Sequence, residues 1–164
     1  MGLDENELTE KIIGAAIEVH RHLGPGLLES AYEECLCYEL TQSGLRFKRQ
    51  AYLPIHYKGL RLESAYRMDL VVEDAVVVEI KATEGTPSIH SAQVLTYLKA
   101  AGLQVGLLIN FNVPVLTKGL KRVVNHYVGP APNKIDAETR RRGESPSDFP
   151  PRLRVSASRI PAVK

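Results

Sequence analysis

The chain has 164 residues, a hydrophobic content of 44% and a formal net charge of +2. This length is enough for one domain with its own core. No apolar run approaches the roughly 20 residues that a transmembrane helix requires, so we expect a globular protein that does not span a membrane.

The N-terminal third predicts two helices. Apolar residues recur at helical spacing from about residue 5 to 22, and Gly24-Pro25-Gly26 ends this helix. A second helix is expected from about residue 28 to 43, with Gly44 as its stop signal.

Two features of this region indicate the compartment. Cys35 and Cys37 have a spacing that suits neither an intrahelical disulfide nor a zinc site, so we expect free, buried thiols. The N-terminus is acidic and polar and resembles no secretory signal. We therefore expect a cytoplasmic protein.

The middle of the chain predicts a sheet. Strands are expected at 47–57, 60–72, 75–82 and 105–111, and the first three form an antiparallel meander. The fourth is mostly apolar, as in a strand buried on both faces. A helix over about 87–101, opened by Thr86-Pro87, precedes the fourth strand, and a last helix is expected from about Val115 to His126. The order α, α, β, β, β, α, β, α predicts an α/β (α+β) fold with a mixed four-stranded sheet flanked by helices.

One hairpin carries the most informative residues. The stretch MDLVVEDAVVVEIKA has apolar runs on both sides of Glu73-Asp74, and folding it about residue 74 places Asp69 opposite Glu79. Glu79 and Lys81 are two residues apart, so on a strand they share a face. Two like charges at about 4 Å repel by roughly 4 kcal/mol at an effective dielectric near 20, and burial adds to that cost. A divalent cation would remove the repulsion, as a metal-assisted phosphodiester hydrolase requires.

The next helix adds polar residues near the end of the strand that bears Lys81. Gln93 and Tyr97 are four residues apart and lie on one helical face, which His90 could join. Taken singly, Tyr97 is also compatible with a core aromatic, and Gln93 with a solvent-facing residue.

The C-terminal segment differs in composition from the rest. Residues 1–128 carry 13 Lys and Arg against 15 Asp and Glu, whereas residues 129–164 carry 8 against 4 and hold six of the ten prolines. We predict a domain over 1–128 and a basic, Pro-rich, disordered tail over 129–164. Arg140, Arg141 and Arg142 could contact phosphates. The alternative is a solvated tail without a role.

The order of Asp69, Glu79-Ile80-Lys81 and Gln93-x-x-x-Tyr97 resembles the PD-(D/E)XK nuclease superfamily. The stretch Gly26-Leu27-Leu28-Glu29-Ser30-Ala31-Tyr32 resembles the GxxExxY signature of one small family within it. The resemblance covers about residues 8–127 and implies a restriction-endonuclease-like core. One departure is that Met68 stands where the superfamily's name has a proline.

The resemblance implies a nuclease that depends on Mg²⁺, with Mn²⁺ as a substitute. The implied metal ligands are Asp69, Glu79, the carbonyl of Ile80, and Glu29. Lys81 would position or deprotonate the attacking water, or stabilise the developing charge. Gln93 and Tyr97 would support these groups and contact the substrate backbone. The implied catalytic set is Glu29, Asp69, Glu79, Lys81, Gln93 and Tyr97.

Several of these residues also have a purely structural interpretation. Asp69 and Lys81 could form a buried salt bridge with Glu79 at the sheet edge, although this leaves the second acid unpaired. Glu29 could be a helix N-terminal acid favoured by the macrodipole. The acidic pair Glu33-Glu34 is expected to lie on a solvated helix face.

Three functions follow from these readings: an active nuclease, a non-cleaving nucleic-acid-binding module, and a protein-interaction module on the same fold. The complete Asp-Glu-Lys set favours the nuclease, because a binder would need a positive surface and the predicted pocket is acidic. Nucleic acid is the expected partner, with DNA favoured over RNA. The sequence contains no base-reading motif and leaves the oligomeric state open.

Overall fold

The computed structural model describes residues 3–85 and 88–126. The predicted tail and the predicted capping pair Thr86-Pro87 lie outside the described residues. The helices and strands, in chain order, are α1 (Glu5–Leu23), α2 (Glu29–Gln42), β1 (Phe47–Tyr57), β2 (Leu60–Val72), β3 (Val76–Lys81), α3 (Ser88–Ala101), β4 (Val105–Asn110), the 3₁₀ turn η1 (Leu116–Gly119) and β5 (Leu120–Val124). None of the helices in this part of the chain combines the length and the hydropathy needed to cross a bilayer.

One mixed sheet holds the fold together, with its strands in the order β1-β2-β3-β4-β5. The first three strands form the predicted antiparallel meander, and α3 crosses over to β4, which runs parallel to β3. The predicted α+β class with a helix-flanked mixed sheet is therefore confirmed.

The predicted last helix from Val115 to His126 is wrong. Only the short turn η1 is helical, and β5 then pairs antiparallel with β4, so the sheet has five strands rather than four. All six residues of β4 are buried, and a strand partner satisfies its outer N–H and C=O groups as a helix could not. Gly119 permits the turn, because a Cβ there would lie 2.1 Å from the carbonyl oxygen of Asn110.

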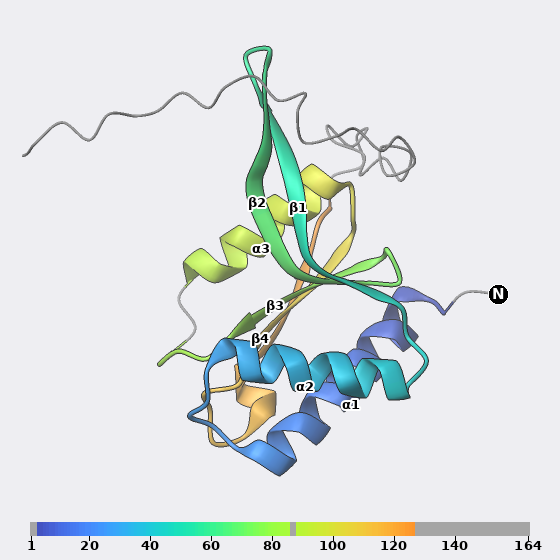
Figure 1. Cartoon of the computed structure of the whole chain (residues 1–164), viewed down its shortest axis with the longest axis vertical. Coiled ribbons are helices and arrows are strands. Elements are labelled where there is room, and N and C mark those ends of the chain that lie inside the picture. Colours follow the sequence, from blue (N-terminus) through green and yellow to red (C-terminus); the bar gives the residue numbers. More distant parts are fainter. Residues whose placement is uncertain (1–2, 86–87, 127–164) are drawn as a thin grey trace, which may run out of the picture.

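Helices cover both faces of the sheet (Figure 1). The helices α1 and α2 pack on one face in a core that includes Val78 and Ile80, and α3 packs on the other in a core that includes Val77. Side chains alternate along a strand, so Glu79 and Lys81 share a face of β3, as predicted, and it is the face that α3 covers.

The β2–β3 hairpin has the predicted register, with Leu70 opposite Val78 and Val72 opposite Val76. Its turn residues Glu73 and Asp74 both have positive φ, at 51° and 54°. This is an unfavourable backbone conformation for residues other than glycine.

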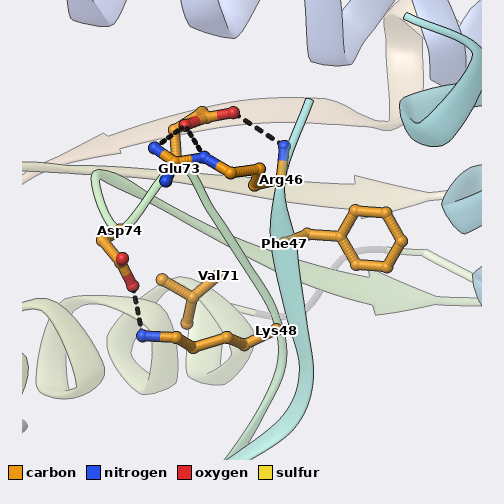
Figure 2. Close-up of a pocket in the computed structure, with 6 residues that line it drawn as sticks. All are labelled: Arg46, Phe47, Lys48, Val71, Glu73 and Asp74. Carbon is orange, nitrogen blue, oxygen red and sulfur yellow. Dashed lines mark hydrogen bonds and ion pairs between the residues drawn. The ribbon is translucent and has the colours of Figure 1, made fainter. Parts of the chain in front are cut away.

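Two ion pairs stabilise this turn from the start of β1, across a small pocket (Figure 2). Glu73 accepts hydrogen bonds from the guanidinium of Arg46 (2.7 Å) and from its backbone N–H (2.7 Å). Lys48 pairs with Asp74 at 2.5 Å. These two ion pairs fix the turn of the β2–β3 hairpin, and Asp69 and Glu79 lie at the opposite, open end of the same hairpin.

The β1–β2 hairpin is much longer and rises from the sheet as a two-stranded ribbon (Figure 1). Its turn, Lys58-Gly59, has positive φ at both residues, 46° and 84°, as in the tight turns that match strand twist. The register shifts between Leu53 and Ile55, at Pro54, which cannot donate a ladder hydrogen bond.

Candidate active site

Asp69 lies where β2 and β3 part. The ladder between the two strands extends from Val72↔Val76 to Leu70↔Val78. At the next position the carboxylate of Asp69 accepts the backbone N–H of Ile80 at 2.8 Å. A side chain thus replaces the backbone partner, and Asp69 is held beside β3 at the level of Glu79.

Glu79 is buried, with only 2% of its surface exposed. Its Oε1 accepts a hydrogen bond from Nζ of Lys81 at 2.7 Å, whereas its Oε2 is buried and has no hydrogen-bond partner in the described part of the chain. The alternative salt bridge between Asp69 and Lys81 is not what forms, because the ion pair of Lys81 is with Glu79. A buried carboxylate oxygen without a donor is an uncommon arrangement in a folded protein.

The pKa values at the site are shifted because its acidic side chains are close together and partly or fully buried. Burial and the charge of Asp69 raise the pKa of Glu79 to about 7, and the ion pair with Lys81 only partly opposes them. Burial likewise raises the pKa of Asp69, against the hydrogen bond from Ile80. For Lys81 burial lowers the pKa, but the hydrogen bond and charge of Glu79 outweigh it and the net shift is upward. The free site therefore disfavours two full negative charges at neutral pH.

The GxxExxY stretch forms the start of α2 and the loop before it. Gly26 has φ of 101°, a conformation that favours glycine. The hydroxyl of Tyr32 donates to the carbonyl of Gly24 (2.6 Å) and accepts the N–H of Leu27 (3.1 Å), so it ties the loop to the helix. Glu29 is exposed and its Oε1 accepts the N–H of Ala82 at 3.3 Å, one residue beyond Lys81. The motif thus places the carboxylate of Glu29 beside the end of β3.

Gln93 and Tyr97 share a face of α3, as predicted. Nε2 of Gln93 donates to the hydroxyl of Tyr97 at 2.5 Å. The ring of Tyr97 is buried in the α3 core and meets Tyr66 of β2 edge-on, with centroids 5.4 Å apart. Burial and the charge of Glu79 raise the pKa of Tyr97, which places its hydroxyl within the field of the acids. The tyrosine is therefore both a core aromatic and a neighbour of the site.

The prediction that Glu33 lies on a solvated helix face is wrong. Only 8% of Glu33 is exposed, and it accepts hydrogen bonds from Arg49 (2.9 Å) and Gln50 (2.6 Å) of β1. Glu34 does lie at the surface, where it also pairs with Arg49 (2.8 Å). The charge of Glu33 contributes to the raised pKa of Asp69, so this carboxylate belongs to the acidic surroundings of the site.

Asn110 is a buried residue that sequence reasoning missed. Its side-chain amide donates to the carbonyls of Thr83 (2.9 Å) and Gly85 (2.8 Å). It is paired in register with Lys81 at the end of the parallel β3–β4 ladder. The one signal in the sequence was a polar residue ending an apolar strand. Asn110 fixes the loop that leaves the site toward α3.

The donor set suits a hard divalent cation. Mg²⁺ takes oxygen ligands, keeps several waters and usually needs only one or two carboxylates from a protein. Asp69 and Glu79 supply two, and the buried, unpartnered Oε2 of Glu79 is an acceptor without a donor. Within residues 3–85 and 88–126 no three His, Cys, Asp or Glu side chains converge into a closed ligand cluster.

Comparison with known families agrees with this geometry. Residues 6–123 match the family model described as the PD-(D/E)XK nuclease superfamily, and the chain belongs to this superfamily. No curated protein and no solved structure matches the chain. Membership supports a nuclease-type function acting on nucleic acid. Assignment to the narrower GxxExxY family stays a prediction.

Proposed function

We propose that the protein is a Mg²⁺-dependent nuclease that hydrolyses phosphodiester bonds, with DNA favoured over RNA. The observation that carries the proposal is the pair of acids at the fork between β2 and β3, the half-buried Asp69 and the buried Glu79, with an oxygen of Glu79 that lacks a donor in the described part of the chain. Burial raises the pKa of both acids, and the charge of Asp69 adds to the shift of Glu79, so a site that keeps both is better explained by a ligand than by packing.

The proposed metal-binding residues are Asp69 and Glu79, with the carbonyl of Ile80 and the carboxylate of Glu29 as additional oxygen donors. Mg²⁺, when bound, would make water more acidic and neutralise charge on the phosphate. Mn²⁺ is the expected substitute, because it accepts similar oxygen ligands.

The remaining roles fall to side chains that border the acids. Lys81 holds a proton on Nζ next to Glu79 and is placed to orient the attacking water or to stabilise charge on the phosphate. Gln93 and Tyr97 present an amide and a hydroxyl from α3 and would hold the substrate backbone. A cytoplasmic location is part of the proposal, supported by the free thiols of Cys35 and Cys37.

A cleavage assay tests the proposal. The full chain is incubated with duplex DNA, single-stranded DNA and RNA, each with Mg²⁺, Mn²⁺ or EDTA. Lys81→Ala should lower turnover about 100-fold or more and keep metal binding, whereas Asp69→Ala should lose both. Glu29→Ala should reduce cleavage with a smaller effect on metal. Lys99→Ala, an exposed lysine on α3, is the matched control and should cut like the wild type.

Two results would contradict the proposal. A Lys81→Ala protein that cuts as fast as the wild type would remove the role given to this lysine. A wild type that cuts none of the substrates with either metal would favour the non-cleaving module, since the fold alone does not determine chemistry.

A further inference from the structure

The β1–β2 ribbon concentrates positive charge in a body that is otherwise acidic. Between residues 52 and 67 the chain has three basic residues, Lys58, Arg61 and Arg67, against one acid, Glu63. The rest of residues 1–128 has ten basic residues against 14 acidic ones. All three basic side chains of this segment, which we call the arm, are exposed. The arm therefore carries an excess of positive charge that attracts a polyanion, as does the stretch from Lys118 to Arg122, which has three basic residues and no acid.

Aromatic rings are interleaved with these charges. Tyr52 is 58% exposed and Tyr57 is 59% exposed, and Lys58 lies over the ring of Tyr57 at 5.5 Å. Tyr52 is directly opposite Arg67 across the ladder, so ring and charge lie on the same face of the ribbon. Exposed rings beside cations are the combination that binds nucleic-acid bases and phosphates.

In the described part of the chain, only one of the three basic residues of the arm forms an ion pair with a carboxylate. Arg61 pairs with Glu63 at 2.8 Å. Lys58 and Arg67 have no carboxylate partner in the described part of the chain. Two or three cations are thus available to a ligand.

The arm is continuous with the candidate active site. Its base carries Tyr66, which packs against Tyr97, and β2 continues from there to Asp69. From Leu60 at the tip to Asp69 the strand spans about 30 Å at roughly 3.3 Å per residue. That length corresponds to about nine base pairs at roughly 3.4 Å each. A nucleic acid bound at the acids is therefore long enough to lie along the arm as well. A two-stranded ribbon such as the arm also fits into the major groove of DNA.

We propose that the arm is a nucleic-acid-binding element that holds the substrate backbone away from the point of cleavage. The inference rests on the proposed function in taking nucleic acid as the ligand. It goes beyond it in assigning affinity to a surface outside the catalytic residues. The cluster of Asp69, Glu79 and Glu29 repels phosphates when metal is absent. The arm, where exposed rings accompany the basic side chains, should therefore supply most of the metal-independent affinity of the domain.

Binding measured in EDTA separates this inference from cleavage. The probe is a fluorescein-labelled 24-base-pair DNA duplex, with its single strand as a second probe, and fluorescence anisotropy gives the Kd over a salt series. The arm variant of the full chain is Lys58→Gln/Arg61→Gln/Arg67→Gln. Its matched control, Lys11→Gln/Lys121→Gln/Arg122→Gln, removes the same charge from exposed positions on α1 and on the opposite sheet edge.

On at least one probe, the arm variant should raise the Kd about tenfold or more and reduce the salt slope by about 2 to 3, one for each lost phosphate contact. The control should change the Kd by less than about threefold. Both variants should melt like the wild type, because the changed side chains are exposed. Lys58→Arg/Arg61→Lys/Arg67→Lys, which keeps the charge, should keep most of the affinity.

Three results would overturn the inference: an equal loss in the control, an unchanged Kd in the arm variant, or no binding of either probe by the wild type. A change in sedimentation of the arm variant without a change in Kd would also overturn it, because the arm would then be a contact between protein chains. Arm-dependent binding by a protein that does not cut would leave this inference standing and contradict the proposed nuclease.

Discussion

The carboxylate of Asp69 accepts the backbone N–H of Ile80 at 2.8 Å, immediately beyond the last Leu70↔Val78 pair of the β2–β3 ladder. The aspartate therefore has two functions in one position. It satisfies a strand N–H at the fork, and it brings a negative charge to the level of Glu79. The two functions can be separated by substitution, because an amide oxygen still accepts a hydrogen bond whereas a methyl group does not.

Asp69→Asn should accordingly be more stable than Asp69→Ala by about 1 kcal/mol or more. Both variants remove the charge, but only alanine leaves the N–H of Ile80 without an acceptor. Urea unfolding in EDTA gives the difference in the free energy of unfolding. Equal stability of the two variants would show that this hydrogen bond does not support the fork.

Mg²⁺ or Mn²⁺ should raise the Tm of the wild type. At 100 times the dissociation constant the gain is about 2.7 kcal/mol, which is several degrees for a domain of this size. The shift should disappear in Asp69→Asn/Glu79→Gln, measured by differential scanning fluorimetry. It should also be smaller at pH 6 than at pH 8, because burial and Asp69 raise the pKa of Glu79 to about 7 and the cation must displace a proton at the lower pH. The same shift in the double variant would remove the proposed metal site.

Glu79→Gln should gain stability relative to the wild type as the pH rises. The pKa of Glu79 is raised from 4.5 to about 7 on folding, so the folded state binds more protons between these values. The wild type therefore loses stability from about pH 4.5 to 7, by no more than about 3 kcal/mol, whereas glutamine does not titrate. Unfolding of both proteins in EDTA at pH 5 and pH 8 measures the change. A difference that moves the other way would indicate that the ion pair with Lys81 dominates.

Tyr32→Phe should weaken the loop that leads into α2 just before Glu29. The change removes the hydroxyl that bonds Gly24 and Leu27 but keeps the ring, which stacks on Phe111 at 4.4 Å. We expect a loss of about 1 to 2 kcal/mol in unfolding free energy and, if the chain cuts, a lower turnover. Tyr38→Phe, on the exposed side of α2, is the control and should change stability by less than about 0.5 kcal/mol.

Gly119→Ala should destabilise the protein by about 2 kcal/mol or more. A Cβ at this position would lie 2.1 Å from the Asn110 oxygen, so the turn into β5 must move. Gly14→Ala is the matched control: nothing lies within 4 Å of its added Cβ, and alanine in a helix should stabilise by up to about 1 kcal/mol. Thermal unfolding of the two variants decides whether the close approach at Gly119 holds the last strand in place.

The hairpin that carries the site was predictable because its signals are local. Apolar runs on both sides of Glu73-Asp74 fix both the turn and the register, so the position of Asp69 opposite Glu79 follows from the sequence alone. The shared face of Gln93 and Tyr97 follows in the same way from helical periodicity.

What could not be predicted depends on residues distant in the chain. The segment after Val115 has apolar spacing compatible with a helix, and only the open edge of β4 decides that it becomes β5. The sequence predicts Glu33 as a surface acid beside Glu34, but in the structure Arg49 and Gln50 of β1 cover it and donate hydrogen bonds to it. In both cases the deciding partner lies on another element, which periodicity does not report.

The proline in the ribbon has a further consequence for β1, the edge strand of the sheet. A long, regular edge strand can template the addition of a strand from another molecule and so start aggregation. Pro54 interrupts the row of donors, and the register shift beside it bends the ribbon away from a flat ladder. The basic side chains of Lys58 and Arg67 add repulsion between copies. The same stretch of chain thus discourages amyloid-like stacking of the protein on itself.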